Sequence, residues 1–405
     1  MKHPYHLFLL LTALFSASCG GSRADLGDFA DAVCTPGHAS GFEILGSPER
    51  TSTLLRITNP WQGADGIEQL VFLSRNGELP PRGFTGQTVR TPVRRVVCMS
   101  SSHVAMFDAV GEVSRVVGVS GLDFLYNSYI NQHKLCGEVR EVGYDSNINF
   151  ELIAALHPDA VMIYGVTDGN SLLTSKLSEL GIPYIYIGDY VEESPLGKAE
   201  WLRVAGELTD RRQAADSLFA SVCERYEHVR STIAGHLSSS ERRPRVMLNA
   251  PYRDTWFLPS PRSYMVRLIL DAGGCPFTAG SAVEPDDADF TGFDRSGDTD
   301  TVTTAAQPVD FEQAYLYASS SDVWLNAGFY PDLDRLLQSI PRLADLRVIR
   351  EGRVYNNNAR LSHGGGSDFW ESGVVNPDIV LTDIAAILHP ELYPDAVLTY
   401  YRRLD

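Results

Sequence analysis

Short apolar runs and amphipathic stretches alternate along residues 94–187. The apolar runs predict buried strands at residues 95–99, 116–119, 159–164 and 183–187. Between them, apolar residues recur every three or four positions and predict helices over residues 101–110, 149–156 and 176–180. Alternation of this kind predicts a mostly parallel sheet that is covered by helices.

The strand pattern stops at about Pro195 and returns after residue 243. In the segment between, apolar residues recur at helical spacing from Ala214 to Ile233, which predicts one long helix. A helix of roughly 20 residues is about 30 Å long, enough to connect two lobes as a stiff strut. A strand over residues 245–249 and a helix over residues 264–270 then begin a second α/β lobe.

Residues 40–90 alternate apolar and polar side chains between turn-forming residues, which predicts paired strands at residues 53–58 and 69–74. We therefore predict an α/β protein with two Rossmann-like lobes, whose sheets are mostly parallel, joined by a long linker helix and preceded by a small β-rich appendage. The expected boundaries are 40–91 for the appendage, 92–194 for the N-terminal lobe, 195–243 for the helical linker and 244–405 for the C-terminal lobe.

The two lobes share a sequence echo. Phe150-Glu151 opens a predicted helix, and Asp159 opens the strand that follows. Phe311-Glu312 and Asp322 repeat this order in the second lobe. An echo of this kind indicates duplicated lobes, with chance similarity as the alternative.

The first 19 residues have the features of an export signal. A polar start precedes an apolar run over residues 7–15, which is too short to span a bilayer as a permanent helix. Small residues then precede Cys19, as in a bacterial lipobox, although Ser16 stands where a bulky aliphatic residue is usual. We expect lipidation of Cys19 and a membrane-anchored protein that faces the periplasm or the cell exterior, with plain secretion as the alternative. Residues 20–39 are expected to form a flexible tether.

The chain is acidic, with 51 acidic against 34 basic side chains and a formal net charge of −17. Such a surface repels phosphate backbones, so nucleic acid is not an expected partner. The charge also favours solubility, whatever the function. The cysteines after Cys19 have no CxxC spacing, and we assign no disulfide or zinc site to Cys34, Cys98, Cys136, Cys223 and Cys275.

Taken together, these blocks resemble the class III periplasmic binding proteins of ABC importers for ferric siderophores, haem and cobalamin. The resemblance covers residues 92–392, and residues 40–90 are an extra module. It rests on the opening strand–helix–strand, on the recurrent helix and strand at the echo, and on the turn before the last strand of the first lobe: Arg95-Val96-Val97, Ser101-Ser102-His103, Val116-Val117-Gly118-Val119, Phe150-Glu151, Pro158-Asp159-Ala160-Val161 and Gly181-Ile182-Pro183.

The resemblance implies a monomer that captures a metal chelate (a ferric siderophore, haem or cobalamin) between its lobes and delivers it to an ABC transporter permease. The ligand is expected at the loops that leave the carboxyl ends of the strands. It is the cargo, and we expect no enzymatic cofactor. Glu151 and Glu312 are expected to pair with arginines of the permease. Their alternative role, which does not exclude docking, is to stabilise helix N-termini as carboxylates.

The candidate ligand contacts lie at predicted strand ends and in loops. Ser101, Ser102 and His103 lie at a helix N-terminus, where free amides attract anions, although a serine there is equally a helix cap. Aromatic side chains stack on flat macrocycles, and an arginine pairs with an anionic chelate, although packing in the core or exposure in a loop are the alternatives. The further candidates are Tyr164, Tyr190, Arg253, Trp256, Tyr264, Asn326, Asp368 and Trp370.

Three other functions remain as alternatives. A direct metal-ion receptor needs converging ligands, to which His103, His363 and Asp368 are candidates, although no paired spacing occurs. An enzyme is disfavoured, because the GxSxG, HExxH and Walker motifs are missing from the sequence. The third alternative is a surface lipoprotein that recruits another protein, in which case the space between the lobes would have no role.

Overall fold

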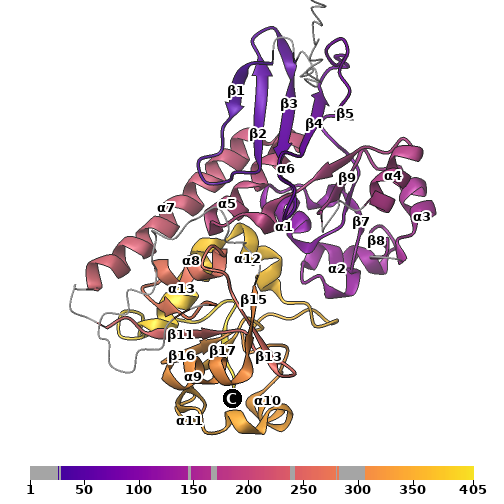
Figure 1. Ribbon diagram of the computed structural model, residues 1–405. Coiled ribbons are helices and arrows are strands. Elements are labelled where there is room, and N and C mark those ends of the chain that lie inside the picture. The colour runs from indigo at the N-terminus through magenta and orange to yellow at the C-terminus, as the bar shows by residue number, and fades with distance from the viewer. Residues whose placement is uncertain are drawn as a thin grey trace, which may run out of the picture.

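The computed structural model describes residues 26, 29–144, 147–165, 171–237, 242–279, 281 and 306–405. A β-sheet appendage lies at the top of Figure 1, the first α/β lobe lies below it to the right, and the second lobe lies at the bottom. The expected leader at residues 1–19, with Cys19, falls outside the described residues. Among the helices within the described ranges, none is both long enough and apolar enough to cross a membrane.

The appendage is a five-stranded sheet in the order β1-β2-β3-β4-β5. Neighbouring strands are antiparallel except for β4 and β5, and Thr53 lies opposite Leu73, so the expected strand pair at residues 53–58 and 69–74 is confirmed. The sheet begins before the expected residue 40, inside the segment expected to be a tether. Its strands are β1 Asp31–Cys34, β2 Phe42–Ser47, β3 Arg50–Thr58, β4 Glu68–Ser74 and β5 Gln87–Arg90.

Two carboxylates also fix the chain just before β2. Glu200 accepts hydrogen bonds from the amides of His38 and Ala39, both at 2.8 Å. Glu192 accepts one from the amide of Gly41 at 3.0 Å. The last residues of the expected tether are therefore docked on the linker, because buried carboxylates require hydrogen-bond donors and these backbone amides supply them.

The sheet of the first lobe is entirely parallel, in the order β10-β9-β6-β7-β8. Its elements alternate as the sequence predicts, and Val96, Val97 and Cys98 of the central strand are fully buried. They are β6 Val96–Cys98, α1 Ser101–Ala109, β7 Val116–Val119, α2 Ser128–Leu135, β8 Arg140–Glu141, α3 Phe150–Ala155, β9 Ala160–Ile163, α4 Ser171–Glu179 and β10 Tyr184–Tyr186.

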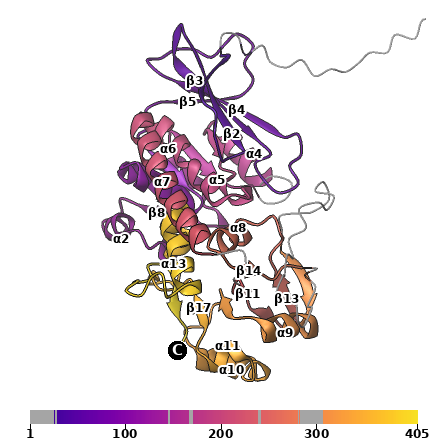
Figure 2. The same ribbon diagram turned by 90° about the vertical axis from the view of Figure 1, so that its left-hand side faces the viewer.

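Three helices form the linker: α5 Pro195–Glu200, α6 Leu202–Thr209 and α7 Arg212–His236. The 25 residues of α7 give a length of about 38 Å. Helix α7 packs against α6 near one end and against α13 of the second lobe along the rest, and Figures 1 and 2 show it running beside both. The expected strut is present.

The second lobe has a five-stranded sheet in the order β14-β11-β16-β17-β18, parallel except for β18, and a separate antiparallel sheet β12-β13-β15. Its strands are β11 Arg245–Leu248, β12 Pro251–Tyr252, β13 Thr255–Leu258, β14 Cys275–Pro276, β15 Gln307–Asp310, β16 Val323–Leu325, β17 Val354–Asn356 and β18 Arg402–Arg403. Its helices are α8 Tyr264–Asp271, α9 Phe311–Ser320, α10 Leu333–Ser339, α11 Arg347–Arg350, α12 Ser372–Val375 and α13 Pro377–Leu388.

The echo between the lobes has the same structural role in both. Asp159 accepts a hydrogen bond from the Arg95 amide at 3.0 Å, beside the start of β6. Asp322 accepts one from the Arg245 amide at 2.8 Å, at the start of β11. Each aspartate therefore ties the strand that it precedes to the first strand of its lobe, β6 or β11. The two-lobed α/β fold, with two separate mostly parallel sheets, is confirmed.

The core is continuous between the parts of the molecule. One hydrophobic cluster extends from the appendage through the first lobe and the linker to the second lobe, where it includes Val246 and Leu248. Met247, which lies between them in β11, points to a second cluster inside the second lobe. Alternate residues of this strand therefore face different layers, as the period of a β-strand requires.

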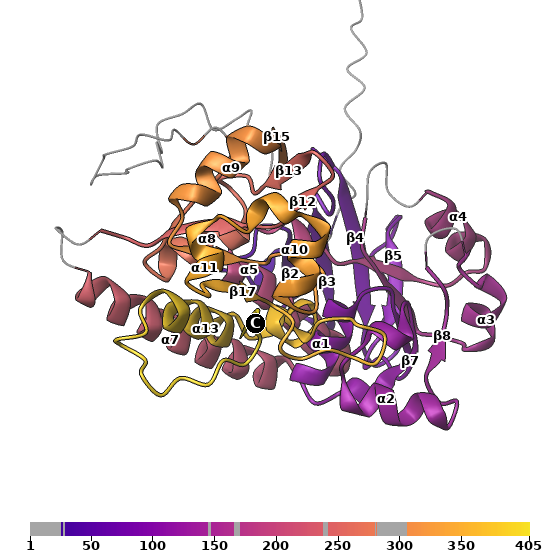
Figure 3. The ribbon, with the colours of Figure 1, turned by 90° about the horizontal axis from the view of Figure 1, so that it is seen from below.

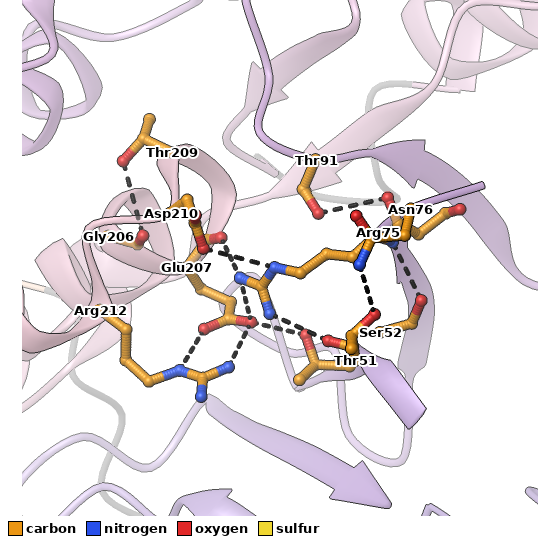
Figure 4. Close-up of polar contacts among 12 residues, drawn as sticks. Thr51, Ser52, Arg75, Asn76, Thr91, Gly206, Glu207, Thr209, Asp210 and Arg212 are labelled. Carbon is orange, nitrogen blue, oxygen red and sulfur yellow. Dashed lines mark hydrogen bonds and ion pairs between the residues drawn. The ribbon is translucent and has the colours of Figure 1, made fainter. Parts of the chain in front are cut away.

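A polar network joins the appendage to the linker (Figure 4). Glu207 of α6 is fully buried and accepts hydrogen bonds from Thr53 at 2.6 Å and from Arg212 at 2.7 and 2.8 Å. Arg75, which follows β4, lies 3.0 Å from the same carboxylate. Burial opposes ionisation, but Arg212 and Arg75 hold the pKa of Glu207 below its usual value. The appendage is thus anchored by a buried, paired charge.

Candidate functional site between the lobes

Both parallel sheets reverse their winding beside the first strand of the lobe. In the first lobe the reversal lies between β6 and β9, and in the second it lies between β11 and β16. Asn249 and Asn326 follow β11 and β16 with φ values of 63° and 59°, a left-handed conformation that asparagine tolerates. Open α/β sheets bind ligands outside the carboxyl ends of the strands at such reversals.

Buried polar side chains from both lobes meet near these strand ends. We call them the inter-lobe polar cluster, and it consists of His103, Asp189, Lys198, Tyr264, Asn326 and Tyr401. The first two belong to the first lobe, Lys198 to helix α5 of the linker, and the other three to the second lobe.

The cation of the cluster is Lys198, which is buried. Its ammonium donates a hydrogen bond to the backbone carbonyl of Asp189 at 2.9 Å and lies 3.9 Å from the carboxylate of the same residue. It also lies 4.8 Å from the centre of the Tyr264 ring, across the lobe interface. Burial lowers the pKa of Lys198, and the Asp189 and Glu192 carboxylates oppose this shift.

His103, on α1, is only 1% exposed. Neither ring nitrogen makes a hydrogen bond of good geometry to any described residue. Burial lowers the pKa of His103 to about 4, although the Asp189 carboxylate and the Met162 carbonyl favour protonation. The imidazole is therefore neutral at physiological pH.

In the second lobe, the hydroxyl of Tyr264 is also buried without a hydrogen bond to the described part of the chain. The hydroxyl of Tyr401 and the side-chain oxygen of Asn326 make none of good geometry there, although these two side chains are close enough to interact with each other. Burial raises the pKa of Tyr264 far above its ordinary value, so its hydroxyl stays protonated and able to donate. The same holds for Tyr401, whose rise in pKa the neighbouring Asn326 side chain opposes. Buried polar atoms are normally hydrogen-bonded, so each orphaned atom here needs an explanation.

Beside Lys198 and Tyr264 lies a small cavity of about 20 Å³, whose other walls are Phe369 and apolar residues of α5, α8, α12 and α13. A space of this size holds about one water molecule. The lobes are thus closed upon each other here, and a larger ligand requires them to separate. The cluster offers the Lys198 cation, two tyrosine hydroxyls, an imidazole and an amide beside the Asp189 carboxylate, and the hydrogen-bond donors among these groups suit a ligand with anionic oxygens.

Several contacts hold the lobes together around the cluster. Ser101 of α1 donates a hydrogen bond to the backbone carbonyl of Trp370 at 3.1 Å. These two predicted ligand contacts therefore face each other across the interface. Glu371, only 3% exposed, accepts hydrogen bonds from the amides of Tyr126 and Asn127 of the first lobe at 2.7 and 2.9 Å.

The ionisation of Glu371 depends on this closed arrangement. Burial raises its pKa to about 7, and the nearby Asp368 and Asp108 carboxylates act in the same direction. The two amides oppose the rise. This carboxyl group at the lobe interface therefore keeps its proton to a higher pH than an exposed glutamate does.

The glycine-rich loop over residues 362–367, which we call the latch loop, joins the second lobe to the first. The Gly364 amide donates a hydrogen bond to the carbonyl of Asp123 at 3.0 Å, and Ser362 donates another to it at 2.9 Å. A Cβ at Gly366 would lie 2.0 Å from the carbonyl oxygen of Phe124. Only glycine permits this close approach.

Two candidates of the first lobe already contact protein groups. The N-cap of α1 is Ser100, which accepts from the Ser102 amide at 3.4 Å, so Ser102 lies inside the helix and is buried. Tyr190 donates a hydrogen bond to the Gly165 carbonyl and accepts one from the Gln62 amide at 3.4 Å. Tyr164 is half-buried against the main core.

Three candidates of the second lobe lie outside the inter-lobe polar cluster. Trp256 is fully buried in the core of the lobe, where its ring nitrogen donates to the Leu248 carbonyl at 2.9 Å. Asp368 is buried and paired with Arg360 at 3.0 Å. Arg253 is exposed at the β12–β13 turn, in a hollow of about 690 Å³ that includes no residue of the inter-lobe polar cluster.

The structure does not bring together the three residues that the sequence suggests as ligands of a direct metal-ion receptor. His103 is enclosed in the first lobe, Asp368 faces Arg360, and His363 lies in the latch loop. The described residues include one group of three potential metal ligands, and it contains none of these.

Glu151 and Glu312 lie where the sequence predicts, in the first turns of α3 and α9, and both are exposed. Figures 1 and 3 place these helices at opposite ends of the molecule, one on each lobe. Glu312 lies 3.6 Å from Arg342. The role of the two carboxylates in docking remains a prediction.

Sequence reasoning missed Asp189, Lys198, Tyr401 and Glu371. Asp189 follows strand β10 closely and could have been found by the same rule that selected Tyr190. Lys198 lies on a linker helix, Tyr401 lies near the chain end, and Glu371 follows Trp370, so no periodicity or motif distinguished them. Their role arises only when the lobes meet.

Comparisons with known proteins agree with this arrangement. The model of the periplasmic binding protein family matches residues 96–361, more than half of the chain. Two lipoproteins of Methanocaldococcus jannaschii, both named as uncharacterized, are each 25% identical to it. The alignments cover 83% and 84% of this chain and 78% and 81% of theirs.

Solved structures share the fold. A periplasmic haem-binding protein of Pseudomonas aeruginosa has a TM-score of 0.53 at 17% identity, covering 77% of this chain and 98% of that one. A molybdate periplasmic binding protein of Haemophilus influenzae has a TM-score of 0.53 at 15% identity, covering 77% and 90%. A periplasmic binding protein of Veillonella parvula has a TM-score of 0.54 at 13% identity, covering 84% and 99%. With two lobes, a helical strut and a polar site between them, this chain belongs to the periplasmic binding protein family.

Proposed function

We propose that this protein is an extracytoplasmic substrate-binding lipoprotein that captures a metal chelate between its lobes and delivers it to an ABC importer. The chelate is a ferric siderophore, haem or cobalamin. The observation that carries the proposal is the inter-lobe polar cluster, in which buried polar atoms of both lobes make no hydrogen bond of good geometry to the described residues.

The chemistry of the cluster favours an anionic member of this class. Lys198 is a buried cation, and the hydroxyls of Tyr264 and Tyr401 are protonated donors. Carboxylates and catecholates accept hydrogen bonds from such groups, and charge-assisted hydrogen bonds are the strong ones. A ferric siderophore or haem, which carries acidic oxygens, therefore fits better than a neutral ligand.

Fold alone does not choose the ligand, because one solved relative is named for haem and another for molybdate. The experiment is to purify the protein from its native host and identify what accompanies it, by mass spectrometry, metal analysis and absorbance. We expect iron or cobalt together with an organic chelator or macrocycle. Molybdenum or a free metal ion without an organic ligand would contradict the chelate proposal.

A pair of variants tests whether the cluster holds that ligand. Lys198→Met removes the cation and keeps the apolar stem, so we expect the co-purified ligand to be lost. Arg253→Met, outside the cluster, is the matched control and should retain it. Equal retention in both variants would place the ligand elsewhere.

Anchoring through Cys19 is part of the proposal and is supported by the lipoprotein names of the two archaeal relatives. Cys19→Ser removes the thiol that would carry the lipid. In this proposal the chain is held to the membrane by acyl chains, so the variant should lose its anchor. Cell fractionation should then find the variant outside the membrane fraction. Unchanged membrane association would show that the anchor is something else.

A further inference from the structure

A second group of chemistry-bearing side chains lies outside the inter-lobe polar cluster, where the ends of α7 and α13 meet. His236 is the last residue of α7, His389 is the C-cap of α13, and Glu391 follows two residues later. One potential ligand atom from each residue lies within 4.8 Å of the other two. The three atoms therefore converge on one point from two helices.

The distances match a shared metal ion. Glu391 Oε1 lies 3.3 Å from His236 Nε2 and 3.6 Å from His389 Nδ1. Ligand atoms bound to one zinc ion at about 2.0–2.2 Å in a tetrahedron lie about 3.3–3.6 Å apart. Only the two ring nitrogens need to approach each other, and His236, partly exposed at a helix end, is able to rotate toward the buried His389.

The ring of His389 is oriented as metal-binding histidines usually are. Its Nε2 lies 3.1 Å from the Ala272 carbonyl, which only accepts hydrogen bonds, so Nε2 carries the proton. Nδ1 is then left with a lone pair toward the Glu391 carboxylate. A backbone carbonyl that fixes the tautomer in this way is a common outer partner of a metal-ligating histidine. Gly273, with φ +78°, permits the contact, because a Cβ there would lie 2.9 Å from Nε2.

A lone pair that faces a carboxylate is repulsive unless a proton or a cation lies between them. Both helices also direct their C-terminal ends, which carry partial negative charge, toward this point. A divalent cation relieves both features together.

We propose that His236, His389 and Glu391 form a binding site for a zinc-class divalent cation, with two imidazole nitrogens, one carboxylate oxygen and an open fourth position for solvent. Nitrogen ligands favour zinc and its transition-metal neighbours over magnesium and calcium, which prefer oxygen. The site is separate from the proposed chelate site and does not depend on it. It would tie the end of the strut to the second lobe.

The test is a zinc titration of the full chain, purified without a histidine tag and stripped with a chelator. We expect one equivalent of Zn²⁺ to bind by calorimetry, and Co²⁺ to give the visible absorption of a tetrahedral site. His236→Ala and Glu391→Gln should each weaken Zn²⁺ binding at least about tenfold, since even the loss of an outer partner costs that much. His236 is partly exposed and Glu391 is exposed, so the variants should fold.

Two controls separate this site from others. His228→Ala removes an exposed histidine on the same helix and should leave Zn²⁺ affinity unchanged. Lys198→Met should also leave it unchanged, even where the chelate is lost. No Zn²⁺ binding by the wild-type chain, or equal binding by the wild type, His236→Ala and Glu391→Gln, would overturn the proposal.

Discussion

At the scale of single residues, the inter-lobe polar cluster lowers the stability of the closed protein but supplies hydrogen-bond donors for a ligand. The hydroxyl of Tyr264 is buried without a hydrogen bond among the described residues, which costs about 1–3 kcal/mol in the closed protein. The same hydroxyl is a free donor for a ligand once the lobes separate. Groups that cost stability but supply contacts are typical of functional sites.

Tyr264→Phe should therefore change two quantities in opposite directions. Without the orphaned hydroxyl, the free energy of unfolding should rise by about 1 kcal/mol or more. Affinity for the co-purified ligand should fall about tenfold, the value of one hydrogen bond to a charged group. Urea unfolding and ligand titration measure the two effects.

Tyr226→Phe is the matched control. Its hydroxyl is also in a buried side chain but donates to Asp271 at 2.8 Å, outside the cluster. Its loss should lower stability by about 1–2 kcal/mol and leave ligand affinity unchanged. If the two variants change stability in the same direction, the account of Tyr264 is wrong.

Glu371 predicts a pH dependence. Its pKa rises from 4.5 to about 7 in the folded protein. Between these values the folded protein holds a proton that the unfolded chain has lost, so the free energy of unfolding falls as pH rises through this window. The full contribution is about 3 kcal/mol, at 1.36 kcal/mol per pKa unit.

Glu371→Gln removes this titration. Measured by urea unfolding, the stability of the variant relative to the wild type should increase by about 3 kcal/mol between pH 4.5 and pH 8. The exposed Glu49→Gln should show a change within about 0.5 kcal/mol over the same range. A constant difference for Glu371→Gln would show that this carboxyl group titrates normally.

The surroundings of single side chains were harder to predict than the elements or the fold. Trp256 and Tyr264 are both aromatic residues near predicted strand ends, yet one fills the core and the other faces the lobe interface. The sequence does not distinguish them, because the difference arises from the separate sheet β12-β13-β15, in which Trp256 of β13 packs into the core of the second lobe. Asp368 is a similar case, because the sequence alone does not show that Arg360 pairs with it.

At the scale of elements, the sequence was more informative. Strands β6, β7, β9 and β10 lie within one or two residues of the predicted runs, because fully buried strands of a parallel sheet are continuously apolar. Helix α4 begins at Ser171, earlier than the predicted residue 176, and β1 was not predicted. Strand β1 lies at a sheet edge and only its Cys34 is buried, so its alternation of apolar and polar residues is weak.

Glu207 tests how the appendage is attached. Glu207→Ala leaves Arg75 and Arg212 without their buried partner, so we expect a loss of about 3–5 kcal/mol of stability. Glu179→Ala breaks an exposed pair with Lys176 and should cost at most about 1 kcal/mol. Thermal unfolding of both variants gives the comparison, and an equal effect would mean that the network in Figure 4 adds little.

At the scale of the whole molecule, the two lobes and the strut were predictable because each lobe repeats the same helix and strand. The closed interface was not, because it joins residues more than 200 positions apart, such as Ser101 and Trp370. Hydrophobic patterns report whether a side chain is buried, not which lobe buries it. This is why the fold could be predicted and the site only in part.

Docking on a permease is a property of the whole molecule, because Glu151 and Glu312 lie on different lobes. The double variant Glu151→Ala with Glu312→Ala should abolish uptake while ligand affinity stays unchanged, because neither residue belongs to the cluster. Uptake assays and ligand titration separate the two effects. Weakened ligand binding would count against the docking role.

The central claim is that the ligand binds between the lobes against the inter-lobe polar cluster. The most direct measurement is a crystal structure of the protein with the ligand that co-purifies with it. We predict that the ligand lies between separated lobes, with its acidic oxygens in hydrogen-bond contact with Lys198 and Tyr264. A ligand bound elsewhere, with these two residues still in contact as in the closed structure, would contradict the account.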